Sequence, residues 1–319
     1  MRSLQDTKWI EHLHPEGSVV DAAKKTLKLR LGAVRQLLRH RPSSETTESE
    51  AIHQVRVASR RAAAAIELYA DLLPSRRVNW IDKRLKKLRK AAGPTRDLDV
   101  TAELFAKFAQ GIDGATVLLS GMEQESRVAR REFRDSYHGW RKDRKLQRRL
   151  KSLRKRVDAE RAAAANARSE TFSRWSRTEL RRVVQEFFDA APTPEADAEA
   201  LHQFRIQCKS LRYTIELVGS AFPPELRNET YPALSQMQSM LGEINDLVMA
   251  SRYLTRTLST AQASLREQPL RALRDACDAR HAAACDEFHL FWSGEIREQL
   301  SSCFEEMLAD REETCDSLR

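Results

Sequence analysis

Two short stretches of the chain combine a histidine with basic residues at helical spacing. At about 100° per residue, each set falls on one narrow stripe of a helix, beside the apolar stripe and not in its centre. Guanidinium groups bind phosphate oxygens through paired hydrogen bonds, and a protonated imidazole adds a further donor. The pattern therefore favours the binding of an anion. The two sets are His53, Arg56 and Arg60, and His202, Arg205, Lys209 and Arg212.

A basic helix face is also common on proteins that bind nothing there. However, like charges four residues apart, as in Arg56/Arg60 and Arg205/Lys209, destabilise a helix by roughly 0.2–0.5 kcal/mol per pair. The chain keeps this unfavourable arrangement twice. A bound anion that relieves the repulsion explains the recurrence better than a solvated face.

The same stretches contain a pattern typical of metal-binding helices. Glu50 precedes His53 by three residues, and Glu199 precedes His202 by three. Ferritin-like di-iron bundles use two such pairs. Here an arginine lies one turn from each histidine and would repel a cation, and both glutamates stand at helix starts, where the helix dipole favours acids. A di-metal enzyme is thus a weaker alternative, and we expect neither a metal nor a cofactor.

The remaining motifs of common enzymes are absent from the sequence. There is no phosphate-binding glycine loop, no nucleophile elbow and no His-Glu-x-x-His. Cys208 falls on the apolar side of its helix, which favours packing over catalysis. We therefore expect a binding protein and not an enzyme.

The histidine stretches belong to an internal repeat. When the chain is shifted by 149 residues, positions 50–100 fall on 199–249 without a gap, and 14 of these 51 positions are identical. The repeat predicts two four-helix bundles with accessory helices, related by a pseudo-two-fold axis. The predicted parts are an N-terminal extension (1–14), the first bundle (15–161), the second bundle (162–312) and a C-terminal tail (313–319).

The periodicity of apolar residues predicts where the helices lie. Residues 41–49 are rich in Pro, Ser, Thr and Glu and are predicted to form a loop, and Gly93-Pro94 is predicted to separate two helices. The expected helices cover 19–40, 50–73, 79–92, 96–110, 115–159 with a break near Gly139, a stretch after Arg168 that ends at Phe188, and 197–220.

Composition agrees with an all-α fold. The chain has 319 residues, of which 41% are hydrophobic and 32% charged, and only ten each are Gly and Pro. Turn-rich β folds need more glycine than this. No apolar run is long enough to cross a membrane, and no secretory signal is visible. Five cysteines without ligand spacing indicate reduced thiols, so we expect a cytoplasmic protein.

The formal charge of +9 is unevenly distributed. Residues 127–161 contain 15 Lys and Arg against 5 acids, whereas residues 286–319 contain 10 acids against 3 basic residues. A basic region of this size favours a polyanionic partner. Nucleic acid bound along 127–161 is therefore an alternative function.

The motifs around the two histidines resemble a known family. His-Gln-Val-Arg-Val-Ala-Ser-Arg-Arg at 53–61 and His-Gln-Phe-Arg-Ile-Gln-Cys-Lys-Ser-Leu-Arg-Tyr at 202–213 are similar to the signature of the conserved histidine α-helical domain, or CHAD, family. A second family element resembles residues 85–100, with a weaker copy at 234–249. The resemblance covers roughly residues 15–310.

This resemblance implies two four-helix bundles with a basic groove between them that binds inorganic polyphosphate, and it implies association with polyphosphate granules. It places both histidine stretches in that groove and adds Arg89 and Arg96 from the second element. Ala63 stands where the family pattern has a basic residue and where the second half has Arg212, so the halves are expected to contribute unequally. The Glu-x-Glu-x-Lys strand that marks the fused triphosphate-tunnel domain of some relatives is not found in this sequence, so the resemblance gives no reason to expect phosphohydrolase activity.

Overall fold

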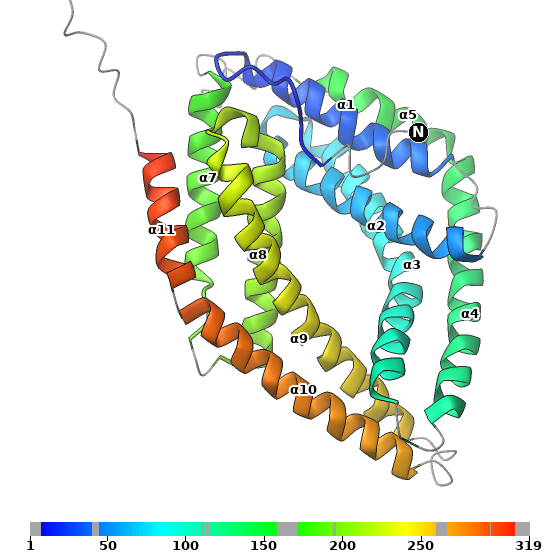
Figure 1. The fold of residues 1–319 in the computed structure, drawn as a ribbon. Helices are drawn as coiled ribbons and strands as arrows, with labels where there is room; N and C mark the ends of the chain where they lie inside the picture. Colours follow the sequence, from blue (N-terminus) through cyan, green and yellow to red (C-terminus); the bar gives the residue numbers. More distant parts are fainter. Residues whose placement is uncertain are drawn as a thin grey trace, which may run out of the picture.

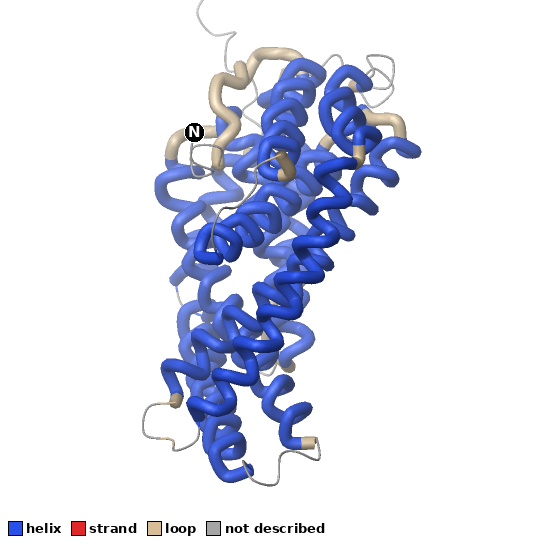
Figure 2. Tube along the Cα trace, turned by 90° about the vertical axis from the view of Figure 1, so that its right-hand side faces the viewer, coloured by secondary structure: helices blue, strands red, loops and turns tan. Residues whose placement is uncertain are grey.

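The structure is a computed structural model that describes residues 8–39, 45–109, 112, 115–157, 171–193, 196–259, 267–293 and 295–309. These residues form helices and connecting segments, with a single isolated β-bridge between Ser18 and Thr171 and no strand among them (Figure 2). The predicted all-α class is therefore confirmed. None of the described helices combines the length and hydropathy that crossing a lipid bilayer requires.

The helices form two sets, and equivalent helices occur in the same order along the chain in both sets. The first set occupies the top and right of Figure 1, and the second occupies the left and bottom. The first comprises α1 (Val19–Leu37), α2 (Glu45–Leu68), α3 (Ser75–Phe108), α4 (Ala115–Lys142) and α5 (Arg144–Ser152), with short 3₁₀ helices η2 (Ala70–Leu72) and η3 (Leu153–Arg156). The second comprises α7 (Phe172–Asp189), α8 (Ala198–Val218), α9 (Tyr231–Leu258), α10 (Glu267–Ser293) and α11 (Glu295–Leu308), with η4 (Gly219–Ala221) and a π-helical turn η5 (Leu226–Thr230).

Each set packs around its own hydrophobic cluster, and the two sets meet along equivalent helices. Helix α2 contacts α8, and α3 contacts α9. The clusters interlock, because Leu217 and Val218 of α8 join the first cluster whereas Phe105 of α3 joins the second. This arrangement brings the two histidine helices together. The predicted pseudo-two-fold axis and the domain boundaries stay predictions, and the segments 162–168 and 313–319 lie outside the described residues.

The prediction that Gly93-Pro94 separates two helices is wrong. Helix α3 continues from Ser75 to Phe108 with Pro94 inside it. An internal proline costs a helix about 3 kcal/mol, because one backbone hydrogen bond is lost. The burial of Leu85, Leu88, Ala92 and Phe105, each 0% exposed, on both sides of the proline outweighs this cost.

Other helix ends also differ from the prediction. Helix α2 already begins at Glu45, within the predicted loop, and ends at Leu68. The break predicted near Gly139 lies at Asp143, whose carboxylate accepts a hydrogen bond of 2.9 Å from the backbone N–H of Leu146 and so caps α5. Helical periodicity places the buried faces well, but it does not locate such caps.

Part of the predicted N-terminal extension is packed into the fold. Ile10 and Leu13 are buried in the first cluster. The ring of Trp9 lies 4.8 Å from that of Tyr231 in the second set of helices. Residues 8–14 therefore join the two halves and do not project from them.

Candidate functional site

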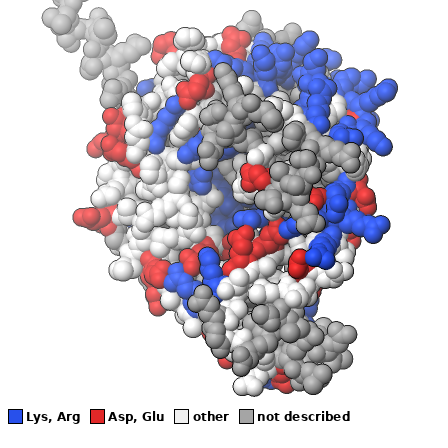
Figure 3. Space-filling model, turned by 45° about the vertical axis from the view of Figure 1, so that its right-hand side comes forward, with Lys and Arg blue, Asp and Glu red and all other residues white. Residues whose placement is uncertain are grey.

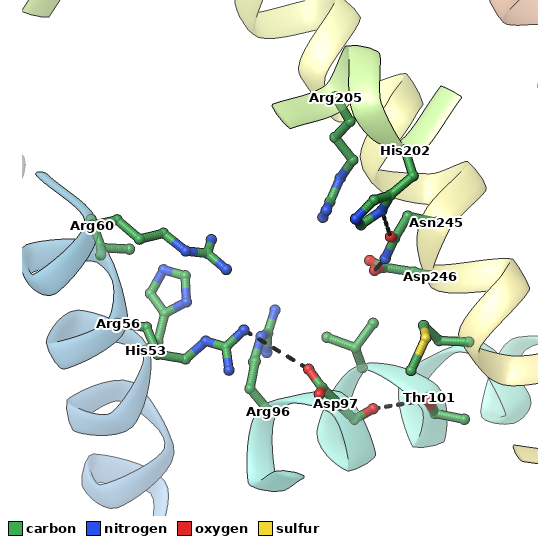
Figure 4. Close-up of a pocket in the computed structure, with 13 residues that line it drawn as sticks. His53, Arg56, Arg60, Arg96, Asp97, Thr101, His202, Arg205, Asn245 and Asp246 are labelled. Atoms are coloured by element: carbon green, nitrogen blue, oxygen red, sulfur yellow. Dashed lines mark hydrogen bonds and ion pairs between the residues drawn. The ribbon is translucent and has the colours of Figure 1, made fainter. Parts of the chain in front are cut away.

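A cavity of about 330 Å³ lies where α2, α3, α8 and α9 meet. Side chains from all four helices converge on it (Figure 4). It contains six of the nine residues predicted from the sequence. The residues that line this central pocket are His53, Arg56, Val57, Arg60, Arg96, Asp97, Val100, Thr101, His202, Arg205, Asn245, Asp246 and Met249.

The two histidine helices present these residues because their apolar stripes are buried elsewhere. On α2, Ile52, Val55 and Ile66 are at most 2% exposed. On α8, Phe204 and Leu211 are fully buried. Anchoring one stripe fixes the rotation of each helix, so the neighbouring basic stripe must face the space between the bundles. The apolar stripes predicted from the sequence are thus the buried faces of α2 and α8.

The pocket is built mainly from pairs of residues that lie 149 positions apart. Ten of its thirteen residues form such pairs, and equivalent helices supply the two members of each. A pseudo-two-fold axis through the pocket would produce this pairing. The pairs are His53/His202, Arg56/Arg205, Arg96/Asn245, Asp97/Asp246 and Val100/Met249.

The pair Arg96/Asn245 gives the two histidines different neighbours. His202 Nδ1 lies 3.1 Å from Asn245 Oδ1, within hydrogen-bonding distance. At the equivalent place in the first half stands the cation of Arg96. Burial, and then the charge of Arg96, lower the pKa of His53, although Glu50 partly opposes the shift. Ala63 and Arg212 predicted unequal halves, but within the pocket the pair that differs is Arg96/Asn245.

Basic groups crowd together in and beside the pocket. Burial and the neighbouring charge of Arg60 lower the pKa of Arg56. Burial likewise lowers the pKa of Arg205, although Asp246 opposes the shift. Lys209 has its pKa lowered to about 7 by burial and by the charges of Arg205 and Arg60. These lowered pKa values mean that burial and the neighbouring cations disfavour the charged forms of these side chains. A bound anion would favour the charged forms again.

Two carboxylates moderate this charge. Asp97 lies on α3 with one carboxylate oxygen 3.9 Å from a terminal nitrogen of Arg56, and Asp246 occupies the equivalent place on α9. Four guanidinium groups thus face two carboxylates in the pocket. Neither aspartate was among the predicted site residues. Their recurrence at the offset of 149 was a signal that could have identified them.

Figure 3 shows the same combination of basic and acidic side chains on the surface. A hollow near the middle of this face has basic side chains inside it and acidic side chains along its lower edge. An anion that enters the hollow would therefore be attracted to its interior and repelled from one rim.

Three predicted residues do not line the pocket. Arg89 donates a hydrogen bond of 3.1 Å to the backbone carbonyl of Ser59. Lys209 lies beside the pocket, close enough to Arg205 and Arg60 for their charges to shift its pKa. Arg212 points into a different cluster, where it donates to the Gln238 side chain at 2.6 Å and to the Tyr231 hydroxyl at 2.7 Å.

That cluster is organised around Glu216, whose side chain is 0% exposed. Arg61 of the first half donates to both of its carboxylate oxygens, at 2.7 and 3.1 Å. Tyr231 donates to it at 2.7 Å, and Arg30 and Arg212 lie 3.7 and 3.8 Å away. Buried charges of this kind are retained when they are paired, so the cluster joins the two halves.

The glutamates of the metal-type motif are engaged with other side chains. Glu50 accepts a hydrogen bond of 2.7 Å from Gln54, and Glu199 accepts one of 2.7 Å from Gln203. Within the part of the chain that the structure describes, no group of three or more His, Cys, Asp or Glu side chains is placed to hold a metal ion.

The helices and the pocket define the class of protein: an all-α fold with two sets of helices that enclose a basic, partly buried pocket between the two histidine helices. The family model of the CHAD domain matches residues 30–255. The chain therefore belongs to the CHAD domain family, as its motifs predicted. A comparison with curated proteins finds no match.

Two solved structures share this fold. One is the CHAD domain from the plant Ricinus communis, with a TM-score of 0.65, 21% identity, and coverage of 90% of this chain and 96% of the other. The other is PptA from Streptomyces chartreusis, with a TM-score of 0.65, 16% identity, and coverage of 87% of this chain and 100% of the other. At these identities the likeness concerns the fold.

Proposed function

We propose that the central pocket binds inorganic polyphosphate. The observation that supports this most directly is the crowding of four guanidinium groups and two histidines in a cavity of about 330 Å³. Membership of the CHAD family supports the same ligand. The proposed contacts are His53, Arg56, Arg60, Arg96, His202 and Arg205, with Lys209 as a nearby charge.

Binding of this kind depends on charge and on shape. Guanidinium groups donate paired hydrogen bonds to phosphate oxygens, and each contact releases counterions from the polyanion. On this proposal a single flexible phosphate chain enters the space between the helices more readily than a bulky duplex does. The affinity should therefore fall steeply with salt and should favour polyphosphate over bulky polyanions.

The proposal is tested by titrating the protein with polyphosphates of defined length by calorimetry. Hydrogen bonds to charged groups are worth about 1.5–3 kcal/mol each, so Arg56→Gln combined with Arg205→Gln should cost about 3–6 kcal/mol of binding, or roughly 10²–10⁴ in Kd. Circular dichroism should show unchanged helix content, because neither side chain belongs to the core.

A matched control removes two charges elsewhere. Lys83 and Lys87 are exposed on α3 and lie outside the pocket. Their replacement by Gln should change Kd less than about threefold, since exposed charges away from the site act only through a screened field. Equal losses in the two double variants would contradict the site assignment.

We further propose that binding is the whole activity of the pocket and that the protein associates with polyphosphate granules in the cytoplasm. The lining residues are mostly donors for phosphate, and the groups among them that could act as nucleophiles are Thr101, the two aspartates and the two histidines. Polyphosphate incubated with the protein should keep its chain length on a gel. Release of orthophosphate that depends on His53 or His202 would refute this part of the proposal.

A further inference from the structure

A second basic surface lies at α5 and η3, away from the central pocket. Residues 144–156 contain eight Lys and Arg and no acidic residue. Leu146, Leu150 and Leu153 are buried in the first hydrophobic cluster, which holds the opposite side of the segment toward solvent. The exposed side chains of this α5 surface are Arg144, Lys145, Arg148, Lys151, Lys155 and Arg156.

The charges of the α5 surface differ from those of the preceding helix. In α4, Arg127 pairs with Glu123 at 2.7 Å, Arg130 with Asp99 at 2.9 Å and Arg134 with Glu48 at 3.2 Å. Among the described residues, no carboxylate lies within ion-pairing distance of the Lys and Arg side chains of 144–156. The basic run thus divides into a part in which three arginines are paired and a part in which no ion pair is found among the described residues.

Trp80 of α3 fixes the edge of this surface. Arg149 lies 4.2 Å from the centre of its ring, Arg84 lies 5.0 Å away, and Lys145 lies 5.6 Å away. Such cation–π contacts hold the basic side chains of two helices together. They also occupy the ring, so it is not offered as a platform for stacking bases.

Figure 3 shows a dense group of Lys and Arg at the upper end of the molecule, the end at which Figure 1 draws α5. Arg144, Arg148 and Lys151 follow one another at α-helical spacing on α5, and Lys155 continues the series on η3, over about 18 Å in all. Small anions would not need such a line, whereas duplex DNA carries one charge per about 1.7 Å of its axis.

We propose that the α5 surface binds the phosphate backbone of a nucleic-acid duplex, without reading its sequence. The surface offers charges in a row but no free aromatic ring, which suits backbone contact better than base recognition. None of the large apolar side chains exposed on the described chain lies on α5 or η3, so a lipid surface would gain only electrostatic attraction there. The proposal does not depend on what the central pocket binds.

The test is fluorescence anisotropy with a labelled DNA duplex of about 20 base pairs and mixed sequence, measured over a range of salt concentrations. The variant carries Arg144→Gln, Arg148→Gln, Lys151→Gln and Lys155→Gln, all at exposed positions. Each lost phosphate contact should reduce the slope of log K against log salt by about 0.9, so the four together should reduce it by roughly 3.6. At low salt the affinity should fall at least 100-fold.

A matched control removes the same charge from the opposite half. It carries Arg174→Gln, Arg256→Gln, Arg271→Gln and Arg297→Gln, which are also exposed. This control should keep the duplex affinity of the wild type within about twofold and should leave the salt slope unchanged, because the slope depends on the number of phosphate contacts that the bound surface makes. Circular dichroism and thermal unfolding should show that both variants fold.

Four results would overturn the proposal. The first is a wild-type protein that does not bind the duplex in low salt, and the second is an equal loss in the two variants. The third is an α5 variant that keeps its duplex affinity but loses binding to phosphatidylserine vesicles or to polyphosphate, which would assign the surface to one of those ligands. Duplex binding that is lost on Arg56→Gln with Arg205→Gln would move the nucleic-acid site to the pocket and would equally refute the proposal.

Discussion

Replacement of Glu216 by Gln should strongly destabilise the protein, because Glu216 is the carboxylate at the junction of the two halves. Its side chain is fully buried, it accepts two hydrogen bonds from Arg61 and one from Tyr231, and Arg30 lies 3.7 Å away. Gln preserves the shape and one acceptor but removes the negative charge. Breaking a buried ion pair in this way costs about 3–5 kcal/mol, since the cations stay buried without their counter-charge.

The repeat supplies a control for this variant. Glu67 lies 149 residues before Glu216 on the equivalent helix, but it is exposed. Glu67→Gln should change the free energy of unfolding by less than about 0.5 kcal/mol. Both variants are compared with the wild type by urea unfolding, followed by circular dichroism at constant pH and salt.

The expected result is a clear fall in the urea midpoint for Glu216→Gln alone. Arg61→Met together with Glu216→Met should lose less than the single Glu216 variant, because it leaves two cations, Arg30 and Arg212, without this carboxylate where the single variant leaves three. Equal midpoints for Glu216→Gln and Glu67→Gln would show that the cluster contributes little. The two halves would then be held together mainly by other contacts.

Four further predictions concern the pocket. Polyphosphate binding should strengthen as pH falls toward 6 in calorimetric titrations, because a bound anion favours the protonated form of His53, whose pKa is lowered in the free protein. The variant His53→Gln should show a weaker dependence of binding on pH. Folding lowers the pKa of the Lys209 amine to about 7, so the folded state disfavours the charged amine. Lys209→Met should therefore raise the free energy of unfolding at pH 7 by about 1–2 kcal/mol, and it should weaken polyphosphate binding because a nearby positive charge is lost. Asp97→Asn with Asp246→Asn should lower the Kd for polyphosphate several-fold at low salt, an effect that 0.5 M salt should largely remove. Gly93→Ala should stabilise α3 by about 0.5–1 kcal/mol in urea unfolding, because its Cβ would meet only an ordinary contact of 3.5 Å, and a loss of stability would show that the helix needs glycine there.

The sequence predicted those parts of the site that depend on periodicity. Burial of one stripe of α2 and α8 orients the other, so His53, Arg56, His202 and Arg205 could be placed on one surface before the fold was known. The all-α class followed from the same periodicity, and family membership followed from the histidine motifs.

Features that depend on tertiary contacts could not be predicted in this way. Arg212 shares the basic stripe of α8, yet Glu216, Tyr231 and Gln238 draw it into another cluster. Pro94 has the local signature of a helix end, but packing on both sides keeps α3 continuous. Helical spacing gives the direction of a side chain and not its partner, and the partner decides which basic residues remain available to a ligand.

The pairing of pocket residues across 149 positions also bears on the direction of a bound chain. An inorganic polyphosphate reads the same from either end, whereas a peptide or a nucleic-acid strand has a polarity. Equivalent helices supply matching histidines, arginines and aspartates, so the two halves of a chain without polarity could meet similar groups on the two sides of the pocket. The pair Arg96/Asn245 is one place where the two sides differ. A site of this kind suits a uniform polymer better than a ligand whose two ends differ.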